Sequence, residues 1–232
     1  MTLQNIHRFI TLHDSDCRYR FFPAGDVYDF VCGSAMANLF RGNARDGSLN
    51  NIYLQIYRED SVTAHPLLGI ASGSRVRYSS TALVQEGTVD GIRYRVKFRP
   101  VKNIWFWDIQ LDGTGKTVDL VYGQDIGVAG PGGIFSNDLY NSQYLGHSVF
   151  ESDTGYAVCS RHNMGTKNHC YMQQGVLGAN AIHYSTDGLQ FFGLSAKVTG
   201  IPQALSGNLE DTVLQNEFAY TALQTERFCL NG

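Results

Sequence analysis

A glycine-rich stretch with two polar side chains, VYGQDIGVAGPGG at residues 121–133, is the first candidate for chemistry in this sequence. Gln124 and Asp125 follow directly on a predicted strand. A phosphate-binding loop would need GxxxxGK followed by Ser or Thr, and a dinucleotide site would need GxGxxG. Neither pattern occurs here, so we interpret the two side chains as sugar contacts if the stretch faces a site, and as turn-holding groups if it does not.

Four potential metal ligands, Cys159, His162, His169 and Cys170, lie within twelve residues. Their order, C-x2-H-x6-H-C, does not match the spacing of structural zinc sites. The segment has the pattern of a β-hairpin, and neighbouring strand residues such as His169 and Cys170 point to opposite faces. We therefore expect no metal or other cofactor and interpret the segment as a loop with incidental thiols.

Side chains for covalent or acid–base catalysis do not form a recognisable set. The GxSxG pattern of a nucleophilic serine is absent, and the seven histidines are scattered along the chain. Asp125 and Asp138 are the best pair of carboxylates for glycoside hydrolysis, which depends on the distance between them. The favoured interpretation is that each aspartate holds a turn or caps a helix.

Sugar recognition fits the residue types of two other segments better. Aromatic rings pack on the apolar face of a pyranose, while amides, carboxylates and arginines bind its hydroxyl groups. Residues 136–147, SNDLYNSQYLGH, are rich in such side chains, and SRHN at 160–163 lies at a predicted strand end. The alternative is that Tyr140 and Tyr144, four residues apart, form the packed face of a short helix.

Composition limits the class of protein. The 232 residues are 43% apolar and 17% charged with a net charge of −3, and no block of Lys or Arg predicts nucleic-acid binding. No apolar window approaches the ~20 residues that a membrane span needs, and the N-terminus does not resemble a signal peptide. The five cysteines are odd in number and irregularly spaced. We therefore expect free thiols in a reducing compartment, the cytoplasm.

Strands dominate the periodicity of the sequence. Residues 51–58 and 92–98 alternate with a period of two, which is typical of a sheet with one face in water. Residues 104–111, IWFWDIQL, are more uniformly apolar and predict a buried strand. Further strands are expected at 117–123, 148–152, 156–161, 181–186 and 189–196.

Turns and helices complete the predicted fold. Asp-Gly pairs at 90–91 and 187–188 predict tight hairpins. Residues 208–218 begin with an asparagine cap followed by acids and predict a short helix, and 136–145 predict another that Ser136 caps. No linker or repeat interrupts the chain, so we expect a single all-β domain over 1–232, a large antiparallel β-sandwich with one or two short helices.

Several segments in chain order resemble the N-terminal β-sandwich region of glycoside hydrolase family 94 phosphorylases. The most similar members are the 1,2-β-oligoglucan phosphorylases and the related part of cyclic β-1,2-glucan synthases. The resemblance extends from about Tyr19 to Glu226 and depends on the whole run of segments rather than on any one. The segments are GSLNNIYLQIY, IWFWDIQL, VDLVYGQDIGVA, SNDLYNSQYLGHSVF, YAVCSRHN, YMQQG, YSTDGLQFFGLS and NEFAYTALQTE.

The resemblance implies a fold like that of galactose mutarotases and a role in β-1,2-glucan metabolism. Members of the family cleave β-glucosidic bonds with inorganic phosphate and release α-glucose 1-phosphate. Their catalytic aspartate and phosphate site belong to an (α/α)6 barrel, which we expect to be absent from this chain, so that the chain alone is inactive. The sandwich of the family packs on that barrel, contributes to a homodimer and can send a loop towards a substrate site.

The resemblance also implies which residues could contact a β-1,2-glucooligosaccharide. The candidate carbohydrate contacts are Gln124, Asp125, Asn137, Tyr140, Gln143, His147, Arg161 and Asn163.

Two alternative functions stay open: a purely structural packing module, and a mutarotase-like sugar epimerase. The epimerase would use His147 or His183 with Glu151 or Glu217 as its acid and base.

Overall fold

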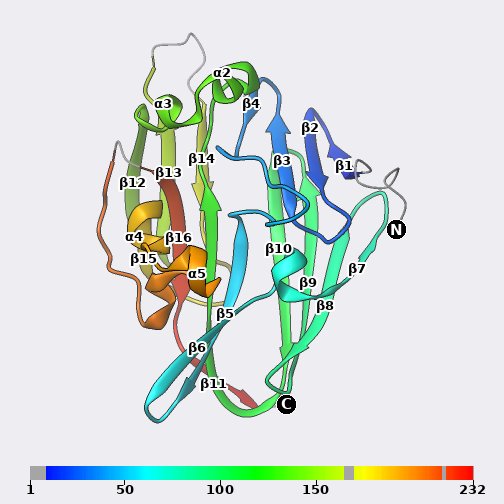
Figure 1. Cartoon of the computed structure of the whole chain (residues 1–232), viewed down its shortest axis with the longest axis vertical. Coiled ribbons are helices and arrows are strands. Elements are labelled where there is room, and N and C mark those ends of the chain that lie inside the picture. Colours follow the sequence, from blue (N-terminus) through cyan, green and yellow to red (C-terminus); the bar gives the residue numbers. More distant parts are fainter. Residues whose placement is uncertain (1–8, 165–169, 216–217, 232) are drawn as a thin grey trace.

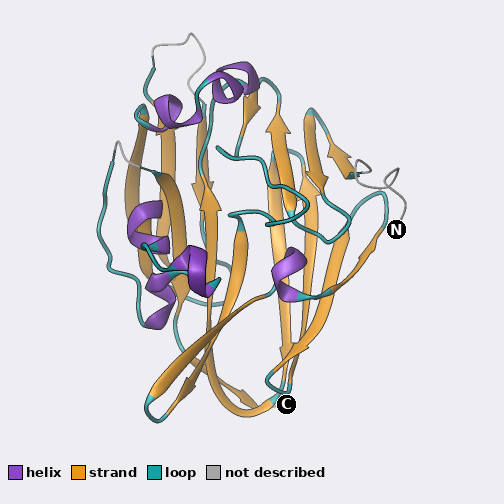
Figure 2. Cartoon of the chain, in the orientation of Figure 1, coloured by secondary structure: helices purple, strands orange, loops and turns teal. Residues whose placement is uncertain are grey.

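Antiparallel strands make up most of the molecule, and the helices between them are short (Figures 1 and 2). The computed structural model describes residues 9–164, 170–215 and 218–231. Within these ranges the strands form one nine-stranded sheet and two four-stranded sheets. The hydrophobic core lies between the sheets, so the prediction of an all-β sandwich is confirmed.

The nine-stranded sheet, here called the large sheet, includes β5 (Asn51–Arg58) and β11 (Thr114–Asp125), which pair with each other along seven residues. Ile52 on one face packs against the β7–β10 sheet, and Tyr53 on the other face packs under short helices. The prediction of one wet face is therefore wrong for β5, because both of its faces are covered. From edge to edge the sheet runs β12 (Leu145–Ser152), β13 (Gly155–His162), β15 (Ala181–Asp187), β16 (Ala219–Thr225), β11, β5 and β6 (Ser61–Pro66), with β14 (Tyr171–Gln174) on β13 and β17 (Phe228–Asn231) on β11.

The β7–β10 sheet has one packed face and one exposed face. In its strand β9, Ile92 and Val96 are buried whereas Arg93 and Arg95 are exposed, which confirms the predicted alternation. Asp90 and Gly91 both have positive φ, 48° and 78°, as a two-residue hairpin of type I′ requires. The strands run in the order β10 (Ile104–Asp112), β9 (Ile92–Val101), β8 (Leu83–Val89) and β7 (Arg75–Tyr78).

Strand β10 differs from the prediction in its burial. It spans the predicted residues, but all of its residues are partly or fully accessible. The reason is its position, since β10 is the edge of the four-stranded sheet and has a neighbour on one side only. Its tryptophans, Trp105 and Trp107, face the core and are half-buried.

The β1–β4 sheet covers one end of the packed face of β7–β10. Phe21 meets Phe98 of β9 edge to face at 5.0 Å between ring centroids, and Tyr19 meets the same ring at 5.2 Å. In Figure 1 these blue strands lie in front of β8, β9 and β10. The strands are β1 (Ile10–Asp14), β2 (Cys17–Phe21), β3 (Val27–Cys32) and β4 (Ala35–Met36).

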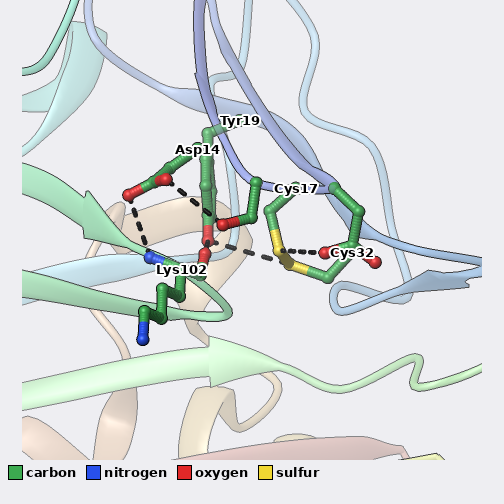
Figure 3. The surroundings of a disulfide bond; sticks show 7 residues. Asp14, Cys17, Tyr19, Cys32 and Lys102 are labelled. Atoms are coloured by element: carbon green, nitrogen blue, oxygen red, sulfur yellow. Dashed lines mark hydrogen bonds between the residues drawn. A yellow bond between two sulfur atoms is a disulfide. The ribbon is translucent and has the colours of Figure 1, made fainter.

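Cys17 and Cys32 form a disulfide across β2 and β3 (Figure 3). The two residues are direct partners in the register of this strand pair, so the cross-link follows from the pairing. The prediction of free thiols is wrong for these two cysteines, and the argument for a reducing compartment loses that support. The pairing was not predictable from the odd number of cysteines, because three further cysteines lie outside this strand pair. They are Cys159, Cys170 and Cys229.

The helices differ most from the predictions. Residues 189–196 do not form a strand, because the carboxylate of Asp187 accepts a hydrogen bond from Gln190 N–H at 2.8 Å and caps α4. The hairpin predicted at 187–188 is therefore wrong. None of the described helices is long and apolar enough to cross a membrane. The helices are α1 (Gly69–Ser72), α2 (Pro131–Ser136), α3 (Asp138–Ser142), α4 (Gly188–Phe192), α5 (Ala196–Thr199) and the 3-10 helix η2 (Gln203–Ser206).

The helix predicted over residues 208–218 is also absent from the described part of this segment, residues 208–215 and 218. Its polar groups bond to neighbouring strands instead of forming helical turns. Leu209 N–H donates to the side chain of Gln224 at 2.9 Å, and Asp211 accepts from Tyr184 N–H at 2.8 Å. Asp211 also has a φ of 56°, which a right-handed helix does not allow.

Candidate carbohydrate site

Gln124 and Asp125 point into the interior at the end of β11. Both are fully buried, at 0% exposure. Asp125 Oδ2 accepts a hydrogen bond from Phe40 N–H at 2.5 Å, and Asp125 N–H donates to Asn50 Oδ1 at 2.9 Å. Gln124 Oε1 accepts a hydrogen bond from the hydroxyl of Tyr122. Within the described structure both side chains therefore contact protein groups, and Asp125 holds the segment of Phe40 and Asn50 against the end of β11.

Burial changes the ionisation of Asp125. Removal from water raises the pKa of its carboxyl to about 7, and the backbone N–H of Phe40 opposes that shift. The carboxylate pair proposed with Asp138 is not supported, because an enclosed Asp125 cannot reach a substrate at the surface. Asp138 instead lies at the start of α3, where Leu139 N–H donates to its Oδ1 at 2.8 Å.

His147 is another candidate that the fold places inside. It is 4% exposed, and its Nδ1 lies 2.9 Å from Ser160 Oγ on the neighbouring strand β13. Desolvation lowers the pKa of His147 to about 4, so the imidazole is neutral near pH 7. The epimerase alternative loses this histidine as a surface acid or base. Its other histidine, His183, is bound to Asp211 at 2.6 Å, and Glu217 lies outside the described residues.

Two short helices, α2 and α3, continue the glycine-rich stretch. Pro131 occupies the first turn of α2, a position where the missing N–H costs no hydrogen bond. Asn137 ends α2 and caps α3, and its Oδ1 accepts from Tyr140 N–H at 2.9 Å. The cap is therefore Asn137, not the predicted Ser136, and its side-chain oxygen is already used by the backbone.

An exposed aromatic pair follows from this arrangement. Tyr140 on α3 is 46% exposed, and its hydroxyl accepts a hydrogen bond from that of Tyr144 at 2.6 Å. The rings meet edge to face at 5.1 Å, and Tyr144 stacks on His162 at 5.8 Å. The hydrogen bond to Tyr140 raises the pKa of Tyr144. The alternative of a packed helical face does not describe Tyr140, which faces solvent.

The end of β13 joins this aromatic pair. Asn163 N–H donates to the carbonyl oxygen of Tyr144 at 2.7 Å, and Arg161 Nε donates to Asn163 Oδ1 at 2.9 Å. Arg161 and Asn163 are both exposed. We call Tyr140, Tyr144, Arg161, His162 and Asn163 the tyrosine cluster. It combines aromatic rings with amide and guanidinium donors at one end of the molecule, where α3 lies in Figure 1.

The fold thus divides the eight candidates. Tyr140, Arg161 and Asn163 come together in the tyrosine cluster, and Asn137 and Gln143 lie on either side of α3, with Gln143 exposed. The other three, Gln124, Asp125 and His147, are interior.

A hollow of about 220 Å³ lies beside the same helices, and Asp138 alone among its lining residues was a candidate from the sequence. Arg41 lies over the ring of Phe135 at 4.0 Å from the centroid, and Asp138 lines the same hollow. No motif connects Arg41 to α2, because ninety residues separate them and their contact depends on the fold.

The described residues contain no group of three or more His, Cys, Asp or Glu side chains that could hold a metal ion. Of the four potential ligands in the 159–170 segment, His169 lies outside the described residues. The segment does form the expected hairpin, since β13 pairs with β14 and Arg161 lies opposite Tyr171.

Comparison with known proteins identifies the family of this chain. Residues 20–232 match the family model described as the SOGP N-terminal domain. The chain belongs to this family. It is 31% identical over 221 residues to a protein of Listeria innocua serovar 6a named 1,2-beta-oligoglucan phosphorylase. The alignment covers 94% of this chain and 20% of that protein, so the chain spans about one fifth of its relative's length.

The predicted resemblance to 1,2-β-oligoglucan phosphorylases is confirmed by this family match and this relative. All eight candidate residues lie within the part that matches the SOGP N-terminal domain. The sequence before Arg20, which includes β1 and the disulfide residue Cys17, lies outside the matched range.

Proposed function

We propose that this SOGP N-terminal domain is a non-catalytic, carbohydrate-contacting and packing module of a glycoside hydrolase family 94 phosphorylase that acts on β-1,2-glucan. The observation that carries the proposal is the tyrosine cluster. Exposed Tyr140 is held next to arginine and asparagine donors by hydrogen bonds that Tyr144 and Asn163 donate.

The cluster has the chemistry that a glucose unit needs. The exposed face of Tyr140 provides an apolar platform, and Arg161 and Asn163 provide donors for hydroxyl groups. The geometry is partly preorganised, because Tyr144 is fixed between Tyr140 and His162. Preorganisation of this kind lowers the entropy cost of binding.

The chemical step belongs elsewhere in this proposal. The relative named 1,2-beta-oligoglucan phosphorylase is about five times as long as the segment it shares with this chain. Phosphorolysis, with inorganic phosphate as co-substrate, would take place in an (α/α)6 barrel on which this domain packs within a cytoplasmic homodimer. The tyrosine cluster would then border the glucan site of that assembly.

Titration of the chain with sophorose and longer β-1,2-glucooligosaccharides, followed by NMR, tests the sugar contact. We expect chemical-shift changes in the tyrosine cluster and about tenfold weaker binding by Tyr140→Ala, the loss that ~1.4 kcal/mol produces. Tyr78→Ala is the matched control, because Tyr78 is 67% exposed on β7, in a different sheet. No shift in the cluster at millimolar sugar would favour the purely structural module.

A second assay tests the absence of catalysis. Incubation of the pure chain with sophorose and inorganic phosphate should release no glucose 1-phosphate. Turnover by the pure chain would contradict the non-catalytic part of the proposal, whatever the titration shows.

A further inference from the structure

One face of the β7–β10 sheet concentrates positive charge. The inner face packs against the β1–β4 sheet and the large sheet, so alternate residues of these strands point outward. Six cations against three carboxylates give the outer face a charge of +3, while the whole chain is −3, so the other residues together carry −6. The cations are Arg75, Arg77, Arg93, Arg95, Lys97 and Arg99, and the carboxylates are Glu86, Asp108 and Asp112.

The arginines surround a shallow hollow on this face. It measures about 500 Å³ and is lined by Arg75, Arg77, Arg93 and Arg95 among others. The side chains are accessible, since Arg93 is 74% exposed and Arg77 is 61% exposed. The guanidinium groups can therefore reach a bound surface without rearrangement of the core.

The carboxylates on the face do not neutralise it. Glu86 is shared between Arg77 at 3.5 Å and Arg95 at 3.3 Å, so one acid serves two cations. Asp108 binds Arg99 at 2.6 Å, and Asp112 binds Arg93.

Two cations on the face have no acid of their own. Arg75 and Lys97 form no ion pair with another described residue. Exposed ion pairs contribute little to stability, so the existing pairs can also exchange for the carboxylates of a partner.

We propose that the outer face of the β7–β10 sheet docks an acidic polypeptide surface other than a copy of this chain. Arginine forks bind carboxylates in two-point geometry, and four of them line one hollow. If two copies of the chain met through this face, a charge of +3 would face a charge of +3 and the two copies would repel each other. A contact between this face and an acidic patch on another side of a second copy would be heterologous, so it would produce a ring or a filament.

Nucleic acid fits this face less well. The three carboxylates would meet phosphates at close range, and the rest of the chain repels a polyanion. Stacking of bases needs an open aromatic ring. The outward-facing aromatic ring of these four strands, Phe106, is covered by Arg99 at 4.0 Å from the centroid. The exposed ring of Tyr78 belongs to the opposite face, because Tyr78 is the register partner of the buried Leu83.

The experiment measures binding of the chain to poly-L-glutamate by fluorescence anisotropy at about 20 mM and about 200 mM salt. We expect binding at low salt that weakens about tenfold or more at high salt, because exposed charges are screened. The face variant Arg75→Glu/Arg93→Glu should bind at least about tenfold more weakly. The control Arg45→Glu/Lys197→Glu changes net charge equally at exposed positions elsewhere and should bind within about threefold of the native chain.

Four outcomes would overturn the proposal: no binding at low salt, equal losses in the face and control variants, concentration-dependent dimerisation that the face variant abolishes, or tighter binding of single-stranded RNA through the same arginines. The neutral variant Arg75→Gln/Arg93→Gln should lose less affinity than the Glu variant, which separates charge from misfolding. Thermal melting of every variant checks the fold. The sugar titration of the tyrosine cluster is independent of this test.

Discussion

Asp125 Oδ2 accepts the backbone N–H of Phe40 at 2.5 Å, which ties the end of β11 to the segment before β5. The N–H of Asp125 donates in turn to Asn50 in that segment. Asp125 is enclosed by protein, so its carboxyl is protonated more readily than in water. The carboxyl therefore couples the packing of the glycine-rich stretch to pH.

Replacing Asp125 with asparagine should remove a pH dependence of stability. The pKa of Asp125 in the folded chain, about 7, is above its ordinary value of 3.8, so the folded state binds the proton more tightly. Its contribution is complete below pH ~4 and is lost as pH rises through ~7, by up to about 4 kcal/mol. Urea denaturation at pH 5 and pH 8 should show the native chain losing about 2–3 kcal/mol relative to Asp125→Asn, because the titration of all other groups, His147 included, cancels in that difference. Parallel losses in both proteins would contradict the assignment.

His147 should produce the opposite pH dependence. Its folded pKa, about 4, lies below the ordinary 6.5, so protonation favours the unfolded chain. Stability is then complete above pH ~6.5 and falls by about 3 kcal/mol as pH drops through ~4. His147→Gln should flatten the acid side of the profile and expose the trend from Asp125. A variant whose acid side remains as steep as that of the native chain would place the titration elsewhere.

The positions of the strands were more predictable from the sequence than the layers that pack on their faces. The period of two located β5 and β9, because side-chain alternation is a local property. It did not reveal that both faces of β5 are covered, since the second layer comes from α4 and η2, more than a hundred residues later. The short run LQFFGLSA illustrates the same limit: its apolar pattern is ambiguous, and the cap by Asp187 decides for a helix.

The candidate site was predictable only in part. Residue types indicated sugar recognition at Tyr140, Arg161 and Asn163, and the fold brings these residues to one end. Type alone could not separate them from Gln124 and Asp125, whose amide and carboxylate groups also suit sugar hydroxyls but are buried in the core. The burial of Gln124 and Asp125 depends on which segments pack next to β11, and that is a tertiary property.

Removing the disulfide should destabilise the chain. Cys17 and Cys32 are separated by 15 residues, and closing a loop of this length contributes roughly 3 kcal/mol through the unfolded state. The double variant Cys17→Ala/Cys32→Ala should show this loss in urea denaturation without reductant. Adding dithiothreitol should affect the native chain and leave the variant unchanged. The control Cys229→Ala changes an exposed thiol and should remain within about 0.5 kcal/mol of the native chain.

Two glycines of the 121–133 stretch should respond in opposite ways to substitution by alanine. A Cβ on Gly127 would lie 2.5 Å from the carbonyl oxygen of Asn38, and backbone at that distance cannot move aside cheaply. Gly127→Ala should therefore cost about 1–3 kcal/mol, as overpacking does. A Cβ on Gly132 in α2 would meet nothing within 4 Å, so Gly132→Ala should be neutral or stabilise by up to ~1 kcal/mol. Equal effects in urea denaturation would mean that the stretch is glycine-rich for turns alone. A difference would show that Gly127 is needed because the chain after β11 passes close to the backbone of Asn38.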